Sequence, residues 1–152
     1  MRVMQVTDLQ RQVIEDDCRR LVARAAAFSD ANDHSAFASL FDLDGVLVRP
    51  DGTSLAGPAA ILAAYQSRPA HRLTRHVLSG TLFSEVSAAD CRATSQVTLW
   101  VCDNRVPAGA LGRPLSQPLV LGEFDDWFRL GKQGWRIARR EARFLIHDPL
   151  SL

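Results

Sequence analysis

The sequence predicts an α+β domain in which three N-terminal helices pack on a curved antiparallel sheet. Apolar residues recur every three or four positions up to about residue 66, which is the period of an amphipathic helix. From residue 72 onward, apolar and polar residues alternate as in strands with one buried face. The 152 residues, 47% of them hydrophobic, suffice for one core but not for two ordinary domains. We therefore expect a single domain over residues 1–152.

The first helix is expected over residues 7–28. Thr7 or Asp8 can cap its start, because short polar side chains accept hydrogen bonds from the first free backbone N–H groups. One face of this helix is apolar, since three- and four-residue steps separate its apolar members: Ile14, Cys18, Leu21, Ala25 and Phe28.

Two shorter helices follow. Asp33 is a natural N-cap for a helix over residues 34–41. Residues 46–48 are β-branched or aliphatic and predict a short strand, which a turn at residues 50–52 ends. The third helix is expected to begin at Pro58, because proline at the first helical position loses no hydrogen bond that the helix would have made.

Four long strands are expected over residues 72–86, 91–102, 119–130 and 135–146. The alternation predicts that His76, Leu78, Gly80 and Leu82 lie on one face of the first of them. A turn at residues 87–90 and a hairpin turn at residues 131–134 connect neighbouring strands. Residues 103–118 are rich in proline and glycine and too long for an ordinary hairpin connection, so we expect a mobile loop or a lid.

Composition excludes several partners and compartments. The formal net charge of +1, from 18 basic and 17 acidic residues, gives no large electrostatic field that would attract a polyanion. Nucleic acid is therefore not expected as a partner. Three cysteines without CxxC spacing fit a reducing cytoplasm. The N-terminus lacks an apolar signal core and no window reaches a membrane-spanning length, so neither secretion nor membrane insertion is expected.

His76 is the first candidate for proton transfer. A histidine changes its charge near neutral pH, so one that points inward from a strand can serve as a general base with little tuning. The competing interpretation is a pocket-wall or core histidine bonded to a neighbour. His71 and His76 would point to opposite faces of the strand, while His34 and His147 have no carboxylate at ligand spacing. We therefore predict no metal site and no cofactor.

Asp126 is the second candidate. Strand alternation groups it with Phe124 and Phe128, so its carboxyl would lie among aromatic rings. Loss of hydration there would raise its pKa and make it a neutral proton donor. The alternative is a salt bridge to Arg129 or to an arginine of the last strand.

One short segment is similar to the nucleophile motif of the haloacid dehalogenase-like phosphatases: FDLDGVL at residues 41–47. That resemblance implies a carboxylate nucleophile, Asp42, and an acid/base partner, Asp44, around magnesium. The motif requires a parallel strand leading into it, whereas here a helical pattern precedes it and antiparallel alternation follows. A phosphatase is therefore the least favoured function.

A second resemblance covers almost the whole chain. Its parts, in order, are the long first helix, the junction at residues 30–33, GPAAI at 57–61, RH at 75–76, FDDW at 124–127 and GWRI at 134–137. On these parts the chain is identified as a member of the SnoaL-like branch of the NTF2-like superfamily, which includes ketosteroid isomerase and scytalone dehydratase. The resemblance implies a cone with an apolar pocket at its open end, and a homodimer formed through the outer face of the sheet.

The resemblance also implies the roles of individual residues. His76 would act as base and Asp126 as proton donor. Asp30 is the acid nearest to the one that scytalone dehydratases carry on their first helix, although the residues themselves favour a role in capping the helix junction with Asp33. Arg49 stands where isomerases carry their general-base aspartate. The substrate would be bound by residues of the pocket wall: Phe28, Tyr65, Leu78, Trp100, Phe124 and Phe128.

The predicted function is therefore small-molecule binding, with a cofactor-independent dehydration or isomerisation of a hydrophobic cyclic or polyketide-like substrate if the protein is an enzyme. The alternative is a non-catalytic ligand-binding or assembly module that resembles a dioxygenase small subunit.

Overall fold

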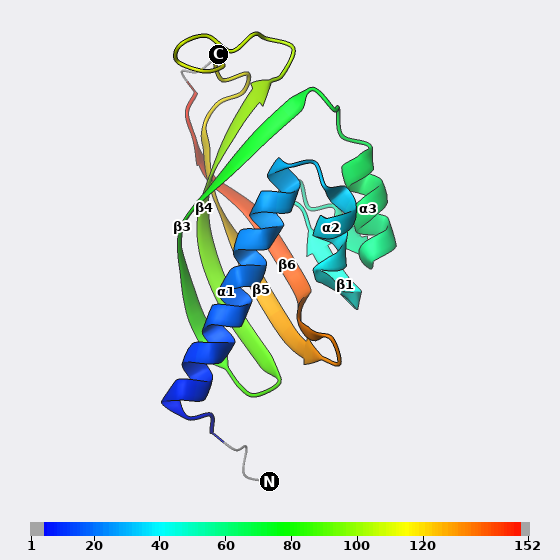
Figure 1. The fold of residues 1–152 in the computed structure, drawn as a ribbon, viewed down its shortest axis with the longest axis vertical. Helices are drawn as coiled ribbons and strands as arrows, with labels where there is room; N and C mark the ends of the chain where they lie inside the picture. Colours follow the sequence, from blue (N-terminus) through cyan, green and yellow to red (C-terminus); the bar gives the residue numbers. More distant parts are fainter. Residues whose placement is uncertain (1–4, 150–152) are drawn as a thin grey trace.

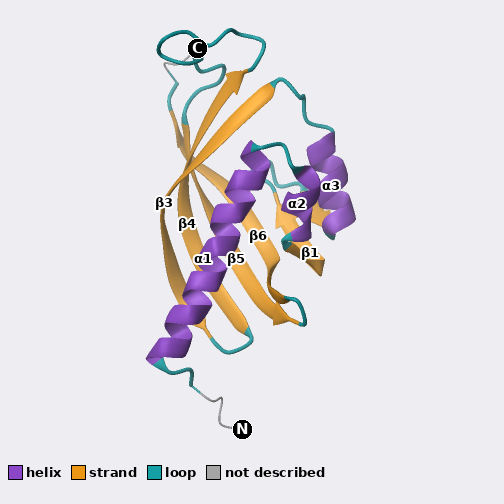
Figure 2. Cartoon of the chain, in the orientation of Figure 1, coloured by secondary structure: helices purple, strands orange, loops and turns teal. Residues whose placement is uncertain are grey.

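The structure, a computed structural model, describes residues 5–149. Six strands form its single sheet: β1 (Phe41–Val48), β2 (Ser54–Ala56), β3 (Arg72–Val86), β4 (Asp90–Asp103), β5 (Val120–Gly131) and β6 (Gly134–His147). Their order across the sheet is β2-β1-β6-β5-β4-β3. All neighbours are antiparallel except β1 and β6, which run parallel. The sheet is curved, and the helices lie on its concave side (Figure 1, Figure 2).

The three predicted helices are confirmed: α1 (Asp8–Asp30), α2 (His34–Ser39) and α3 (Pro58–Gln66). Thr7 caps α1 through a capping box with Gln10, and Asp33 caps α2 by accepting a hydrogen bond from the Ala36 N–H at 3.2 Å. The α1 helix crosses the sheet in contact with β3, β4 and β6, whereas α2 and α3 pack beside β1 (Figure 1). The second helix is shorter than predicted, because residues 41–48 belong to β1.

The core lies between α1 and the sheet. Four of the five residues predicted for the apolar face of α1 are buried, and Phe28 packs partly exposed against the same cluster. The buried sheet residues opposite include Phe128, 1% exposed, and Ile137, 0% exposed. Within residues 5–149, no helix combines the length and apolar composition needed to cross a membrane.

The acidic segment after α2, residues 42–44, is part of β1. Pairing between β1 and β6 is interrupted between Phe41 and Val46, and the extra residues bulge outward. Gly45 returns the chain to the sheet so closely that a Cβ atom there would lie 2.9 Å from the backbone oxygens of both Asp42 and Ile137. The glycine of the phosphatase-like motif is thus explained by backbone packing.

The alternation predicted for β3 is correct only up to Leu78. Register with β4 shifts between Leu78 and Gly80, so the side chains that follow exchange faces. Thr81 points inward, where its hydroxyl lies 2.8 Å from that of Ser95, and Leu82 is 77% exposed on the outer face. The prediction that Leu82 lies on the face of His76 was therefore wrong.

The connection between β4 and β5 extends beyond the end of the sheet (Figure 1). An isolated bridge between Gly109 and Gly112 closes its tip, and another joins Leu115 to Cys102 at its base. Only its last residues, Gln117 and Pro118, line the cavity between the sheet and the end of α3.

Replacement of Gly45 by alanine tests the close approach of β1 to β6. The contacts are to backbone oxygens, which cannot rotate away, so we expect Gly45→Ala to lower the free energy of unfolding by about 1–3 kcal/mol. Gly131→Ala is the matched control, because the nearest atom to a Cβ there is 3.9 Å away. Urea unfolding of both variants measures the difference, and equal stabilities would contradict the close approach.

Candidate functional site

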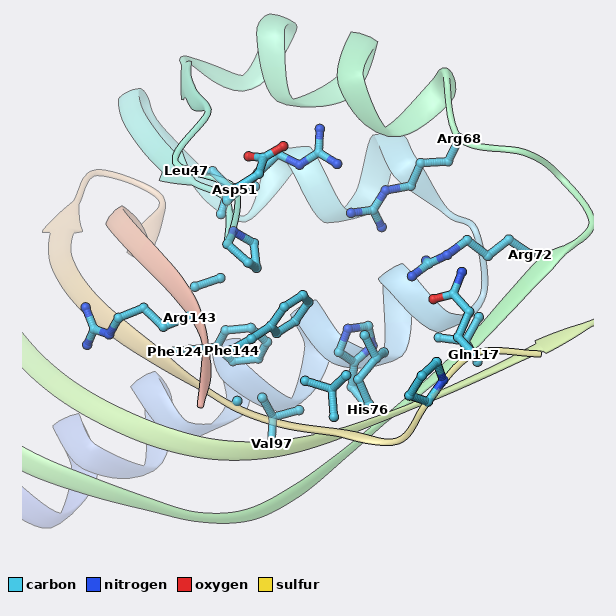
Figure 3. A pocket seen from close by; sticks show the side chains of 18 of the residues that line it. Leu47, Asp51, Arg68, Arg72, His76, Val97, Gln117, Phe124, Arg143 and Phe144 are labelled. Atoms are coloured by element: carbon cyan, nitrogen blue, oxygen red, sulfur yellow. The ribbon is translucent and has the colours of Figure 1, made fainter. Parts of the chain in front are cut away.

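A cavity of about 320 Å³ opens between the curved sheet, the end of α3 and the turn that connects β1 to β2 (Figure 3). Its sheet side is mainly apolar and includes Val97, Leu99 and Phe124. His76 lies on this side, whereas Arg68 and Arg72 approach from the α3 side. A concave, largely apolar wall with a few polar groups is typical of a small-molecule site.

Asp30 holds His76 in place. The last residue of α1 directs its carboxylate at β3, where it accepts hydrogen bonds from the His76 backbone N–H at 2.9 Å and from the Thr74 hydroxyl at 2.9 Å. The His76 Nδ1 atom lies 2.6 Å from Asp30 Oδ1. The two side chains are only 15% and 14% exposed. Asp30 therefore does not cap the helix junction but orients His76.

The carboxylate of Asp30 fixes the protonation pattern of the ring. Burial opposes its ionisation, but the bonds from the His76 ring and backbone, assisted by Thr74, outweigh burial and lower the pKa of Asp30. An ionised carboxylate accepts a hydrogen bond and cannot donate one, so Nδ1 of His76 carries the proton. The other nitrogen, Nε2, is then unprotonated in the neutral ring and available as a base.

Asp126 is bound to an arginine of the last strand, as the salt-bridge alternative predicted. Arg140 donates from Nε to Oδ1 at 2.7 Å and from a terminal nitrogen to Oδ2 at 2.8 Å. Both side chains are buried, at 3% and 0% exposure. Asp126 lines neither the cavity of about 320 Å³ nor a smaller cavity of about 40 Å³ beside His76. The structure thus supports an ion pair here and not a neutral carboxyl among aromatic rings.

Arg140 is a site residue that the sequence analysis missed. Its guanidinium lies 4.1 Å over the ring of Phe124 and lines a small inner cavity of about 40 Å³ together with His76 and Tyr65. Arg143 of the same strand differs, because it pairs with Glu123 and Glu141 on the outer face.

Among the residues predicted to bind substrate, Tyr65 and Phe124 line the cavity with His76. Phe28, Leu78 and Phe128 belong to the core or pack against it. Trp100 is 44% exposed on the outer face, since its β3 partner is the exposed Arg75 and its neighbours Leu99 and Val101 face inward. The expected placement of Trp100 in the pocket was therefore wrong.

The phosphatase alternative lacks its architecture. The sheet is not a parallel βα sheet, and Asp42 and Asp44 lie at an exposed bulge, 3.5 and 3.8 Å from Arg129. Nowhere in residues 5–149 do three His, Cys, Asp or Glu side chains gather as a possible set of metal ligands.

Comparisons with known proteins agree with the fold. A family model of the SnoaL-like domain matches residues 13–141. A Novosphingobium aromaticivorans structure, provisionally described as a scytalone dehydratase, shares 18% identity and a TM-score of 0.78, with 93% of this chain and 91% of that chain covered. A hexachlorocyclohexane dehydrochlorinase from Novosphingobium barchaimii shares 15% identity and a TM-score of 0.76, with 95% and 94% covered. A comparison with curated proteins found no match.

The buried pair predicts a large effect on stability. Asp126→Asn keeps the shape of the side chain but leaves the charge of Arg140 buried without a carboxylate, so we expect a loss of about 3–5 kcal/mol in the free energy of unfolding. Asp16→Asn, in an exposed pair with Arg19, is the control and should be nearly neutral. Urea unfolding measures both. A loss no larger than that of the control would contradict a role for the pair in holding β5 to β6.

Proposed function

Because the chain belongs to the SnoaL-like domain family, we propose that its cavity binds a small hydrophobic cyclic molecule and removes a proton from it, in a cofactor-independent dehydration or related elimination or isomerisation. The observation that carries the proposal is the contact of 2.6 Å between His76 and Asp30 at the wall of the cavity. The dehydratase and dehydrochlorinase descriptions of the structural neighbours support the same class of chemistry.

In the proposed reaction, Nε2 of His76 takes a proton from a substrate carbon. The electron pair of the broken C–H bond forms a C=C bond. A hydroxyl or halide on the adjacent carbon leaves with the electron pair of its bond to that carbon. Asp30 stabilises the imidazolium that forms, as the carboxylate of other histidine–carboxylate pairs does. A leaving hydroxyl can take the proton back from the imidazolium and depart as water.

Arg140 is proposed to replace Asp126 as the polar group opposite the base. It lines the small inner cavity beside His76, where its guanidinium would stabilise negative charge that develops on a carbonyl oxygen or a leaving group. Asp126 then acts as a positioning residue, because its two hydrogen bonds fix the plane of the guanidinium.

Elimination from model compounds tests this function. We would incubate the protein with β-hydroxy and β-chloro cyclic ketones, each with and without a ring carboxylate, and follow the ultraviolet absorbance of the conjugated enone. Removal of the base by His76→Ala should lower the rate by about 10² or more. Asp30→Asn should also lower it, since an amide can donate as well as accept and no longer fixes the tautomer of the ring as the carboxylate does.

His147→Ala is the control, because this exposed histidine at the end of β6 does not line the cavity. Circular dichroism melts of all variants separate loss of activity from loss of fold. If no compound reacts, or if folded His76→Ala keeps the wild-type rate, the non-catalytic ligand-binding or assembly module replaces the enzyme.

We also propose a cytoplasmic homodimer formed through the outer face of the sheet. The three cysteines are free, which fits a reducing compartment. Apolar side chains are exposed on the outer face around β3, namely Val77 at 51%, Leu82 at 77% and Trp100 at 44%.

Charge placed in that apolar surface tests the dimer. We expect sedimentation equilibrium to give a dimer for the wild type and a monomer for Val77→Glu, because a carboxylate would be buried without a partner in the interface. Gln66→Glu, at an exposed position on α3 and away from the outer face of the sheet, is the comparison variant and should remain a dimer. A monomeric wild type would refute the proposal.

A further inference from the structure

Three arginines surround one end of the cavity. Arg68 follows the end of α3, and the turn over residues 69–72, closed by a bond from the Arg72 N–H to the Pro69 carbonyl, brings Arg72 to the same side. Figure 3 shows both side chains extending over the cavity from that side. Arg49 joins them from the turn between β1 and β2. All three are only partly exposed.

No carboxylate within residues 5–149 forms a salt bridge with these three guanidinium groups, and only the charge of Arg49 acts on a lining carboxylate, where, after the hydrogen bonds from Thr53, it helps to lower the pKa of Asp51. None of them takes part in a salt bridge or donates a side-chain hydrogen bond there. Arg68 instead stacks over the ring of Tyr65 at 3.8 Å. Burial and the nearby positive charges of Arg68 and Arg49 lower the pKa of Arg72. An arginine remains charged even so, and like charges held together favour an anion between them.

The other charged groups that line the cavity do not change this balance. Asp51 is the single carboxylate among the described lining residues, and it is exposed and bound to the Thr53 N–H at 2.9 Å. Arg143 turns away from the cavity toward Glu123, Glu141 and Asp125 (Figure 3). Three partly buried cations therefore face one exposed carboxylate.

We propose that the cavity takes a hydrophobic ring compound that carries one anionic group, a carboxylate being the simplest, and that Arg68 and Arg72 bind this group. A guanidinium matches the two oxygens of a carboxylate with two parallel N–H donors. The ring would then lie on the apolar wall formed by Val97, Leu99 and Phe124. The inference rests on the proposed function, because it names the substrate class of the same cavity.

The test compares two probes that share one ring system: 2-naphthoate, which is anionic near neutral pH, and 2-naphthamide, which is neutral. Isothermal titration calorimetry should show that the wild-type protein binds naphthoate about tenfold more tightly or better, equivalent to about 1.4 kcal/mol. The difference in affinity between the two probes should become smaller in 1 M sodium chloride, where the Debye length falls to about 3 Å.

Variants then test whether Arg68 and Arg72 cause the preference for naphthoate. Arg68→Gln/Arg72→Gln should bind the two probes equally, whereas Arg68→Lys/Arg72→Lys keeps the charge and should retain part of the preference. Arg11→Gln/Arg20→Gln is the matched control, because it removes two positive charges from the exposed side of α1 and should keep the full preference.

Equal affinity of the wild type for the two probes, or binding of neither, would overturn the inference, as would a preference that survives in folded Arg68→Gln/Arg72→Gln. Salt dependence is measured on the wild type and needs no variant to fold. His76→Ala separates the two proposals: it should lose turnover but keep the preference for naphthoate. A wild type that shows His76-dependent elimination but no preference for the anion would leave the proposed function intact and refute only this inference.

Discussion

The carboxylate of Asp30 is the contact on which both the fold and the candidate site depend. It ends α1, and its bonds to Thr74 and to the His76 backbone tie that helix to β3. The same group orients the His76 ring at the wall of the cavity. A helix that shifted along the sheet would therefore lose both this anchor and the orientation of His76, the proposed base. The long first helix is a rigid element that positions this carboxylate, and the proposed acid/base role would require such a rigid support.

Three groups of charged residues within residues 5–149 differ in how their charges are compensated. On the outer face, Arg92, Arg143, Asp125 and Glu123 form exposed or half-buried pairs of alternating sign. In the interior, Arg140 and Asp126 neutralise each other through two short bonds. At the cavity, Arg68 and Arg72 have no carboxylate partner within residues 5–149. Partly buried like charges cost stability, and an anionic ligand bound between them would offset that cost.

Sequence patterns predicted the structural features that depend on residues close together in the sequence. The Thr7 and Asp33 caps, Pro58 at the start of α3 and the hairpin turn at residues 131–134 were all identified, because each depends on groups a few residues apart. The patterns did not predict the bulge after Leu78, the parallel pairing of β1 with β6 or the choice of Arg140 as the partner of Asp126. These features depend on strand register, which pairs residues that are distant in sequence. One extra residue in a strand moves every later side chain to the opposite face of the sheet.

The arginine end and the His76 side of the cavity would act together on one substrate. A proton on carbon is removed only when the base is held close to it, and an apolar ring in an apolar pocket has many equivalent orientations. An anionic group bound by Arg68 and Arg72 on the α3 side would select one of them and turn the opposite part of the ring toward His76 on the sheet side. Binding energy from the non-reacting end would in this way be used to position the reacting end. The arginines would then act on rate as well as on affinity, although none of them touches the proton.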